Sequence, residues 1–126
     1  MFRFSLARFY RSMQHAMRGV ISVYRTEQNF RIQCVAALCI NTLGLIMGLS
    51  SERRLILLIV SVSVLVLELL NSAMERLLDL LKPRLNEYAR EVKDVMAGAV
   101  LLASSAALLV GVFLFWPYMT LFLEHV

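Results

Sequence analysis

Three carboxylates and an amide share one face of a predicted helix in a strongly apolar part of the chain. This acidic stripe consists of Glu68, Asn71, Glu75 and Asp79. Successive members are three, four and four residues apart, which places them along one side of an α-helix. Ionisable side chains at membrane depth are costly and usually functional. The stripe therefore indicates a polar site with a chemical role.

The composition is that of a small membrane protein. Of the 126 residues, 60% are hydrophobic and 17% are charged, and the mean hydropathy is +0.71. These values are too apolar for an ordinary soluble domain of this size. A hydrocarbon core of about 30 Å needs about 20 apolar residues per helix. The segments that approach this length are 32–49, 55–67 if it continues through Glu68, and 95–123.

We therefore expect an all-α membrane protein that forms one domain over residues 1–126. Its predicted transmembrane helices cover about 30–49, 54–81 and 94–118. The second of these helices carries the acidic stripe, and Pro83 is expected to end it at the membrane surface. Gly44 and Gly48 form a G-x-x-x-G pattern, and the third helix is rich in small residues. Both features favour close packing of membrane helices.

Basic residues are distributed unevenly around these spans. Six lie at residues 3–31, up to the start of the first predicted span, five lie at residues 76–93, before the third, and none follows the third. The positive-inside rule then predicts a cytoplasmic N-terminus in a multi-pass protein of a bacterial inner membrane. Arg3, Arg8 and Arg11 interrupt any apolar signal sequence. The net charge of +4 reflects this topology and attraction to anionic lipid, so nucleic-acid binding is disfavoured.

Residues 1–29 are predicted to form an amphipathic surface helix. Apolar residues recur at intervals of three or four between Phe2 and Tyr24, whereas Arg11, Arg18 and Arg25 repeat every seven residues on another face. This pattern suits a helix in the cytoplasmic interface of the membrane. A soluble helix that packs on a partner is the alternative.

Further polar residues stand at the entrances to the other spans, on the same predicted side of the membrane. Glu27 precedes the first span, and Lys93 and Asp94 precede the third. Glu27 and Glu75 could hold Mg²⁺, a hard ion that prefers carboxylate and phosphate oxygens. Lys93, assisted by Arg8, could neutralise the charge of a phosphate group.

Glu68 is expected to lie deeper in the membrane than Glu75. Seven residues separate the two, which corresponds to about 10 Å along a helix. At that depth a partly buried carboxylate could accept the proton of a lipid hydroxyl group. Phosphoryl transfer needs positioning, a metal ion and charge neutralisation. A small membrane protein with these groups could therefore phosphorylate a lipid alcohol.

Two motifs resemble those of the prokaryotic diacylglycerol kinase and undecaprenol kinase family of small trimeric membrane enzymes. The run E-L-L-N-S-A-M-E at 68–75, followed by Asp79 and the K-D pair at 93–94, is similar to the family signature. The run E-Q-N-F-R at 27–31 is similar to the family's first-span motif. The resemblance extends from about residue 8 to residue 110.

This resemblance implies an ATP-dependent lipid kinase that acts on undecaprenol or diacylglycerol in envelope or phospholipid metabolism. It also implies a homotrimer with active sites between subunits, in which Mg²⁺ accompanies the ATP. By the same resemblance, Glu68 would be the catalytic base, with Asn71 and Asp94 as further catalytic residues. The residues implied to bind ATP are Arg8, Glu27, Glu75 and Lys93, of which Glu27 and Glu75 would also ligate the metal.

The chain departs from the family pattern at two places. Many members carry an acid, an aromatic residue and a histidine where this chain has Arg84, Leu85 and Asn86. Members commonly carry Glu or His in place of Gln33. The resemblance therefore leaves open the nucleotide contacts at 84–86 and the choice between the two lipids.

Two other classes of protein also fit part of the pattern. Glu68 and Glu75 could line the pathway of a small oligomeric ion channel or proton-coupled carrier, and the chain could be a structural membrane subunit. The channel or carrier hypothesis explains the stripe but does not account for Glu27 or for the pair at 93–94. Asp79 is expected to be a solvated charge near the aqueous face.

Overall fold

The described part of the chain folds into four α-helices, three of them apolar. The computed structural model describes residues 5–81 and 86–124, with side chains for 5–80 and 87–120. The helices are α1 (Leu6–Thr26), α2 (Gln28–Ile46), α3 (Ser51–Leu81) and α4 (Asn86–Glu124), and this part of the chain contains no strand. By length and composition, α2, α3 and α4 can each cross a membrane. The expected fold class, an all-α membrane protein with an N-terminal helix and three spans, is confirmed.

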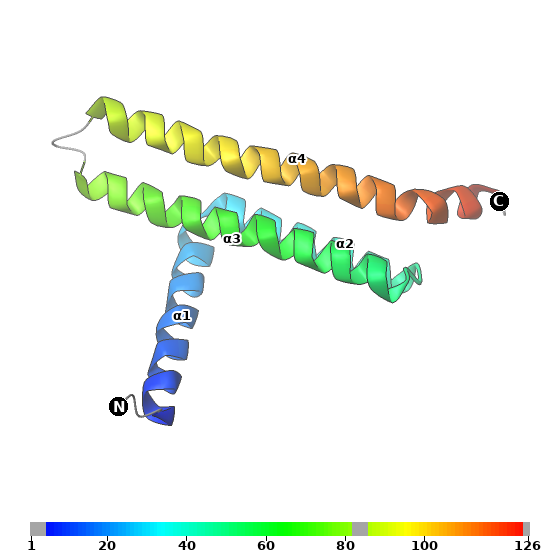
Figure 1. Ribbon diagram of the computed structural model, residues 1–126, viewed down its shortest axis with the longest axis horizontal. Coiled ribbons are helices and arrows are strands. Elements are labelled where there is room, and N and C mark those ends of the chain that lie inside the picture. The colour runs from blue at the N-terminus through cyan, green and yellow to red at the C-terminus, as the bar shows by residue number, and fades with distance from the viewer. Residues whose placement is uncertain (1–4, 82–85, 125–126) are drawn as a thin grey trace.

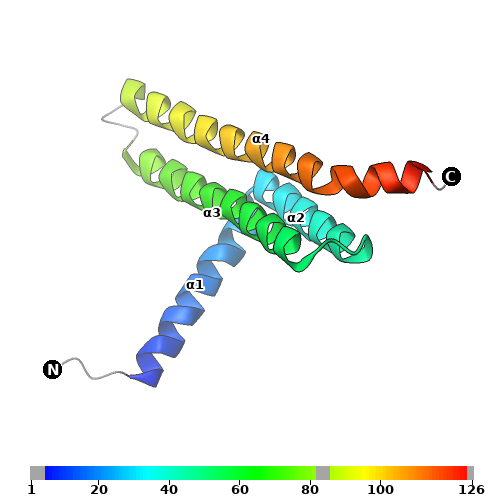
Figure 2. The same ribbon diagram turned by 45° about the vertical axis from the view of Figure 1, so that its right-hand side comes forward.

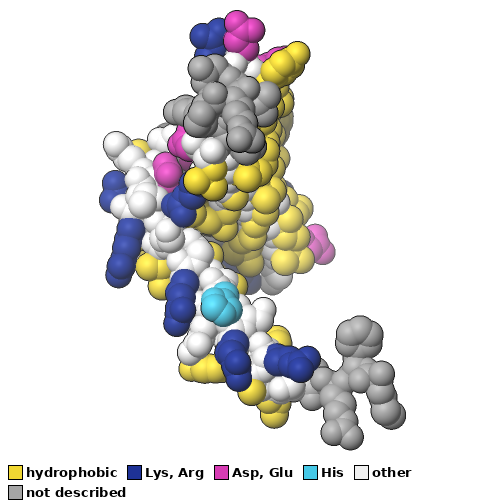
Figure 3. Space-filling model, turned by 90° about the vertical axis from the view of Figure 1, so that its left-hand side faces the viewer, with side chains coloured by type: hydrophobic (Ala, Val, Ile, Leu, Met, Phe, Trp, Pro, Cys, Tyr) yellow, Lys and Arg dark blue, Asp and Glu magenta, His cyan; other side chains and the backbone are white. Residues whose placement is uncertain are grey.

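The three apolar helices lie side by side, whereas α1 projects away from them (Figures 1 and 2). The central helix, α3, packs along α2 and along α4, and α3 and α4 run in opposite directions (Figure 1). Along α1, the basic side chains, which are all arginines, gather on one side and hydrophobic side chains emerge on another (Figure 3). Val23 is the buried residue of this helix. These features agree with a helix that lies in a membrane interface.

The chain changes direction between α1 and α2 at a single residue. Glu27 is both the C-cap of α1 and the N-cap of α2, and its backbone is extended, with φ −103° and ψ 116°. Its N–H donates to the Val23 carbonyl at 2.8 Å, and its own carbonyl accepts from the Arg31 N–H at 3.4 Å. One non-helical residue thus separates two helices of very different direction.

The turn between α2 and α3 explains both glycines of the G-x-x-x-G pattern. Gly48 has φ +69°, and the Leu49 N–H donates to the Gly44 carbonyl at 3.0 Å, which is the hydrogen bond of a Schellman helix end. Leu49 then packs with Leu57 and Phe115 in a small core. A Cβ atom on Gly44 would lie 3.2 Å from Leu57 Cδ2. Gly44 therefore permits close packing, whereas Gly48 permits the turn.

The fourth helix is longer than the predicted third span. It begins at Asn86 rather than near residue 94, and it continues through Pro117 to Glu124. The helix extends beyond the apolar run because its backbone hydrogen bonds form regardless of side-chain hydropathy. At the other connection α3 ends at Leu81, and Pro83, the predicted end, lies outside the described residues.

Candidate functional site

Glu68 is a buried carboxylate within the apolar bundle. The residue is 3% exposed, and Ser72, one turn further along α3, is 2% exposed. They are the two buried polar residues among the described side chains. The Gln33 side chain of α2 faces the Glu68 carboxylate. Burial of a carboxylate costs free energy unless a partner compensates it, so the position of Glu68 indicates a function.

Two further carboxylates come close to Glu68. Glu27, at the junction of α1 and α2, and Glu75, on α3, both lie near enough for their charges to act on it. Both are half-buried. The structure therefore brings three of the four predicted site carboxylates within electrostatic reach of one another, and the fourth, Asp94, lies on α4. Within the described side chains none of the three forms a salt bridge, and like charges at short range repel one another. A cation at this place would relieve that repulsion.

Asn71 supplies an amide beside Glu75. Its Nδ2 donates to Glu75 Oε1 at 3.3 Å, whereas its Oδ1 is buried and has no hydrogen-bond partner. An unpaired buried acceptor costs about 1–3 kcal/mol. Hard cations such as Mg²⁺ prefer such oxygens and usually bind through one or two carboxylates, with water and phosphate oxygens completing the coordination. Described side chains include no group of three or more His, Cys, Asp or Glu arranged for a metal. The oxygens present thus fit a magnesium–phosphate complex better than a metal held by protein alone.

Lys93 is held at the site by an aspartate. Its Nζ lies 2.7 Å from Asp79 Oδ1, and its charge is near enough to interact with that of Glu75. Asp79 is half-exposed, as expected of a residue near the aqueous face, but it also connects α3 to α4. The sequence did not predict this contact, because the pairing depends on the register of two antiparallel helices.

Asp94 follows Lys93, about two turns into α4, and is exposed. It lines a small polar hollow of about 530 Å³. The other residues of this hollow are Glu87, Arg90, Glu91 and Val95. Asp94 is therefore open to solvent next to the lysine predicted to bind phosphate.

Arg76 forms two hydrogen bonds near the site, and the sequence pattern did not predict them. Its Nη1 donates to Ser22 Oγ at 3.1 Å, and its Nη2 donates to Thr26 Oγ1 at 2.8 Å. From the sequence, Arg76 is expected only to be one of the basic residues that determine the membrane topology. In the structure it connects α3 to α1.

Within one copy of the chain, Arg8 lies away from the proposed metal ligands. It is exposed in the first turn of α1, at the end of that helix that points away from the other three (Figure 1). Arg84 and Leu85, at which the family pattern is broken, lie outside the described residues, as does the side chain of Asn86.

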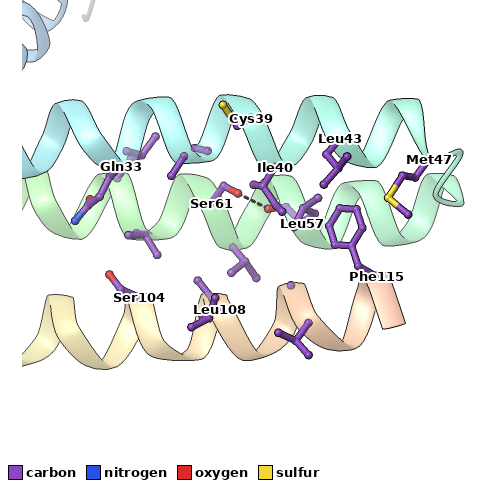
Figure 4. Close-up of a pocket in the computed structure, with 18 of the residues that line it drawn as sticks. Gln33, Cys39, Ile40, Leu43, Met47, Leu57, Ser61, Ser104, Leu108 and Phe115 are labelled. Atoms are coloured by element: carbon purple, nitrogen blue, oxygen red, sulfur yellow. Dashed lines mark hydrogen bonds between the residues drawn. The ribbon is translucent and has the colours of Figure 1, made fainter. Parts of the chain in front are cut away.

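An apolar cavity of about 800 Å³ runs between α2, α3 and α4 (Figure 4). Gln33 lines one end of the cavity, and Met47 and Phe115 line the other. Because Gln33 also faces Glu68, the cavity connects with the polar site. The Oε1 atom of Gln33 is buried and lacks a hydrogen-bond partner, so an acceptor is available where the cavity meets the carboxylates.

Comparison with known proteins agrees with the motifs. The family model of the prokaryotic diacylglycerol kinases matches residues 14–115. An undecaprenol kinase of Bacillus subtilis is 34% identical over 115 residues, which cover 91% of this chain and 94% of the relative. A diacylglycerol kinase of Synechocystis sp. is 37% identical over 107 residues, covering 84% of this chain and 61% of the relative. A diacylglycerol kinase of Escherichia coli is 25% identical over 111 residues, which cover 88% of this chain and 91% of the relative.

Proposed function

Because this chain belongs to the prokaryotic diacylglycerol kinase family and is therefore a lipid kinase of a bacterial membrane, we propose that it transfers the γ-phosphate of ATP to a membrane lipid alcohol. The candidate acceptors are undecaprenol and diacylglycerol, which both present a primary hydroxyl group at the membrane surface. The product would enter lipid recycling for envelope or phospholipid metabolism. Family membership removes the alternative of an ion channel or carrier lined by Glu68 and Glu75.

The observation that carries the chemical proposal is the burial of Glu68 beside two other carboxylates. In the proposed reaction Glu68 accepts the proton of the lipid hydroxyl group. The lipid oxygen forms a bond to the γ-phosphorus, the bond between that phosphorus and the bridging oxygen breaks, and ADP leaves. Because Glu68 is 3% exposed, little water reaches this position, which limits hydrolysis of ATP in place of lipid phosphorylation.

Glu27 and Glu75 are the proposed ligands of Mg²⁺. When bound, the ion would neutralise part of the negative charge of the nucleotide phosphates. Asn71 holds one oxygen of Glu75 through the 3.3 Å hydrogen bond, which restricts the orientation of that carboxylate. The like charges that act on Glu68 and the unpaired oxygen of Asn71 support a cation at this place.

Lys93 is the proposed phosphate-binding residue, and Asp79 orients it through the 2.7 Å ion pair. Asp94, its neighbour on α4, would help to organise the phosphates and the base. An ammonium group acts as a point charge on a flexible stem, so a fixed partner reduces the number of positions that the charge occupies. This arrangement supports a nucleotide that approaches from the end of the bundle where α3 and α4 are connected.

Arg8 requires a second copy of the chain if it binds ATP. It lies at the end of α1 remote from the carboxylates of its own chain. We therefore assign Arg8 to the site of a neighbouring subunit in a homotrimer, with the N-terminus and the nucleotide on the cytoplasmic side of the inner membrane. The basic residues that precede the first span support this orientation.

The apolar cavity is the proposed location of the lipid chain. Its lining is almost entirely hydrophobic, and its one polar end, at Gln33, adjoins Glu68. A hydrocarbon chain in the cavity would direct the hydroxyl group toward the base. The unpaired Oε1 of Gln33 would accept a hydrogen bond from the lipid headgroup.

Transfer of labelled phosphate tests the proposal and identifies the lipid. Purified protein in detergent would receive γ-labelled ATP, Mg²⁺ and either undecaprenol or diacylglycerol at matched mole fractions. We expect labelled lipid phosphate with one of the two, and the ratio of kcat/KM values identifies the preferred acceptor. Absence of product with both lipids, while a known lipid kinase is active under the same conditions, would contradict the proposal.

A further inference from the structure

One guanidinium group bridges α1 and α3. Arg76 donates to the hydroxyl groups of Ser22 and Thr26, which are one helical turn apart on α1. The Thr26 hydroxyl in turn donates to the Ser22 carbonyl at 3.0 Å. Its proton therefore points away from Arg76, and a lone pair remains to accept the hydrogen bond. The planar, forked geometry of a guanidinium group suits two acceptors at this spacing.

The bridge adjoins both proposed metal ligands. Thr26 directly precedes Glu27, and Arg76 directly follows Glu75. Because Glu27 is the only non-helical residue between α1 and α2, the position of its carboxylate depends on the angle between these helices. Residues 6–21 of α1 are all exposed, so they do little to fix that angle within one chain. The bridge ties α1 to α3 at the residues that flank the two carboxylates.

We propose that Arg76 is a positioning residue that, through Ser22 and Thr26, sets Glu27 opposite Glu75 and so prepares the pair of carboxylates for a divalent cation. This inference rests on the proposed function for the identity of the metal ligands. The role differs from direct binding of phosphate by Arg76, because positioning requires the two hydroxyl groups and direct binding does not.

Metal binding to the purified full-length protein tests the proposal without catalysis. The probe is Mn²⁺, titrated in the presence of a non-hydrolysable ATP analogue, and the free ion is measured by electron paramagnetic resonance. The variants are Arg76→Met and the double variant Ser22→Ala/Thr26→Val, which removes both acceptors. The matched control is the exchange Ser22→Thr/Thr26→Ser, which keeps both hydroxyl groups.

We expect Arg76→Met and the double variant each to weaken Mn²⁺ binding by about tenfold, because groups that orient metal ligands affect affinity by this order. A triple variant that combines Arg76→Met with Ser22→Ala/Thr26→Val should bind Mn²⁺ no more weakly than Arg76→Met alone, since all three changes remove one interaction. The hydroxyl exchange should bind like the wild type. In assays of lipid phosphorylation, the metal concentration for half-maximal rate should rise while kcat at saturating metal changes little.

Three results would overturn the proposal. Wild-type binding in both bridge variants, with binding lost in Glu75→Gln, would reject the positioning role and leave the proposed function intact. Weakened binding in Arg76→Met alone would indicate direct contact with the nucleotide. Wild-type binding in Glu75→Gln would reject Glu75 as a metal ligand and, with it, the positioning role of Arg76. If Arg76→Met does not assemble, the hydroxyl variants test the same bridge without loss of charge.

Discussion

The substitution Glu68→Gln removes the proposed base with little change in side-chain shape. General-base catalysis contributes about 10²–10⁴-fold to a rate, which corresponds to about 3–5 kcal/mol of the activation barrier. Glu68 is 3% exposed, so water has little access to replace it as the proton acceptor. We therefore expect kcat to fall by a factor near the upper end of this range.

The same substitution should not destabilise the fold. The negative charges of Glu27 and Glu75 repel that of Glu68, and Glu68 forms no salt bridge with any of the described side chains. A neutral amide removes the repulsion between like charges and the cost of burying an ionised group. The thermal unfolding midpoint of Glu68→Gln should therefore equal or exceed that of the wild type. Loss of activity without loss of stability distinguishes a catalytic role from a structural one.

The assay is the initial rate of lipid phosphate formation at saturating ATP, Mg²⁺ and lipid, with the oligomeric state checked by gel filtration. Glu52→Gln is the matched control, because Glu52 is an exposed glutamate in the first turn of the same helix. It should retain the wild-type rate. A folded Glu68→Gln variant with wild-type turnover would refute the assignment of Glu68 as the base.

Three other substitutions test separate parts of the site. Glu75→Gln should raise the Mg²⁺ concentration for half-maximal rate by about tenfold or more, and an unchanged metal titration would count against its role as a ligand. Asp79→Asn removes the half-exposed ion pair with Lys93, so it should change the free energy of unfolding by less than about 1 kcal/mol. The same change should raise the KM for ATP. An unaltered KM would show that Lys93 binds phosphate without this partner. Gly111→Leu should lower kcat/KM for the lipid, because Gly111 lines the cavity and has open space around it. Gly98→Leu is its control, since Gly98 has equally open space outside the cavity lining, and equal effects of the two changes would contradict a lipid chain in the cavity.

The spans and the burial of Glu68 could be predicted from sequence because both depend on local patterns. Long uncharged runs require a membrane or a core, and the spacing from Glu68 to Glu75 places both on one side of any helix. The sequence predicts Glu27 on the same side of the membrane as the other polar residues, and the structure brings it within electrostatic reach of Glu68. The spans and the burial of Glu68 do not depend on the angles between helices, whereas the position of Glu27 does.

The bridges between helices could not be predicted, because they depend on those angles. The direction of α1 is set at Glu27, where neither glycine nor proline marks a break in the helix. Unless that direction is known, the sequence does not indicate that Arg76 contacts Ser22, 54 residues away. It also does not indicate that Arg8 lies far from the carboxylates of its own chain. Small residues on α4 similarly predicted close packing, whereas Gly111 borders an open cavity.

The most direct test of the central claim follows the oxygen atoms of the transferred phosphate. ATP labelled with ¹⁸O at all γ-phosphate oxygens would be incubated with the protein and the preferred lipid, and the product would be analysed by mass spectrometry. Attack of the lipid hydroxyl group on the γ-phosphorus predicts a lipid phosphate that carries three labelled oxygens and one unlabelled oxygen from the lipid. Label recovered only in inorganic phosphate, with no lipid phosphate formed, would contradict the account.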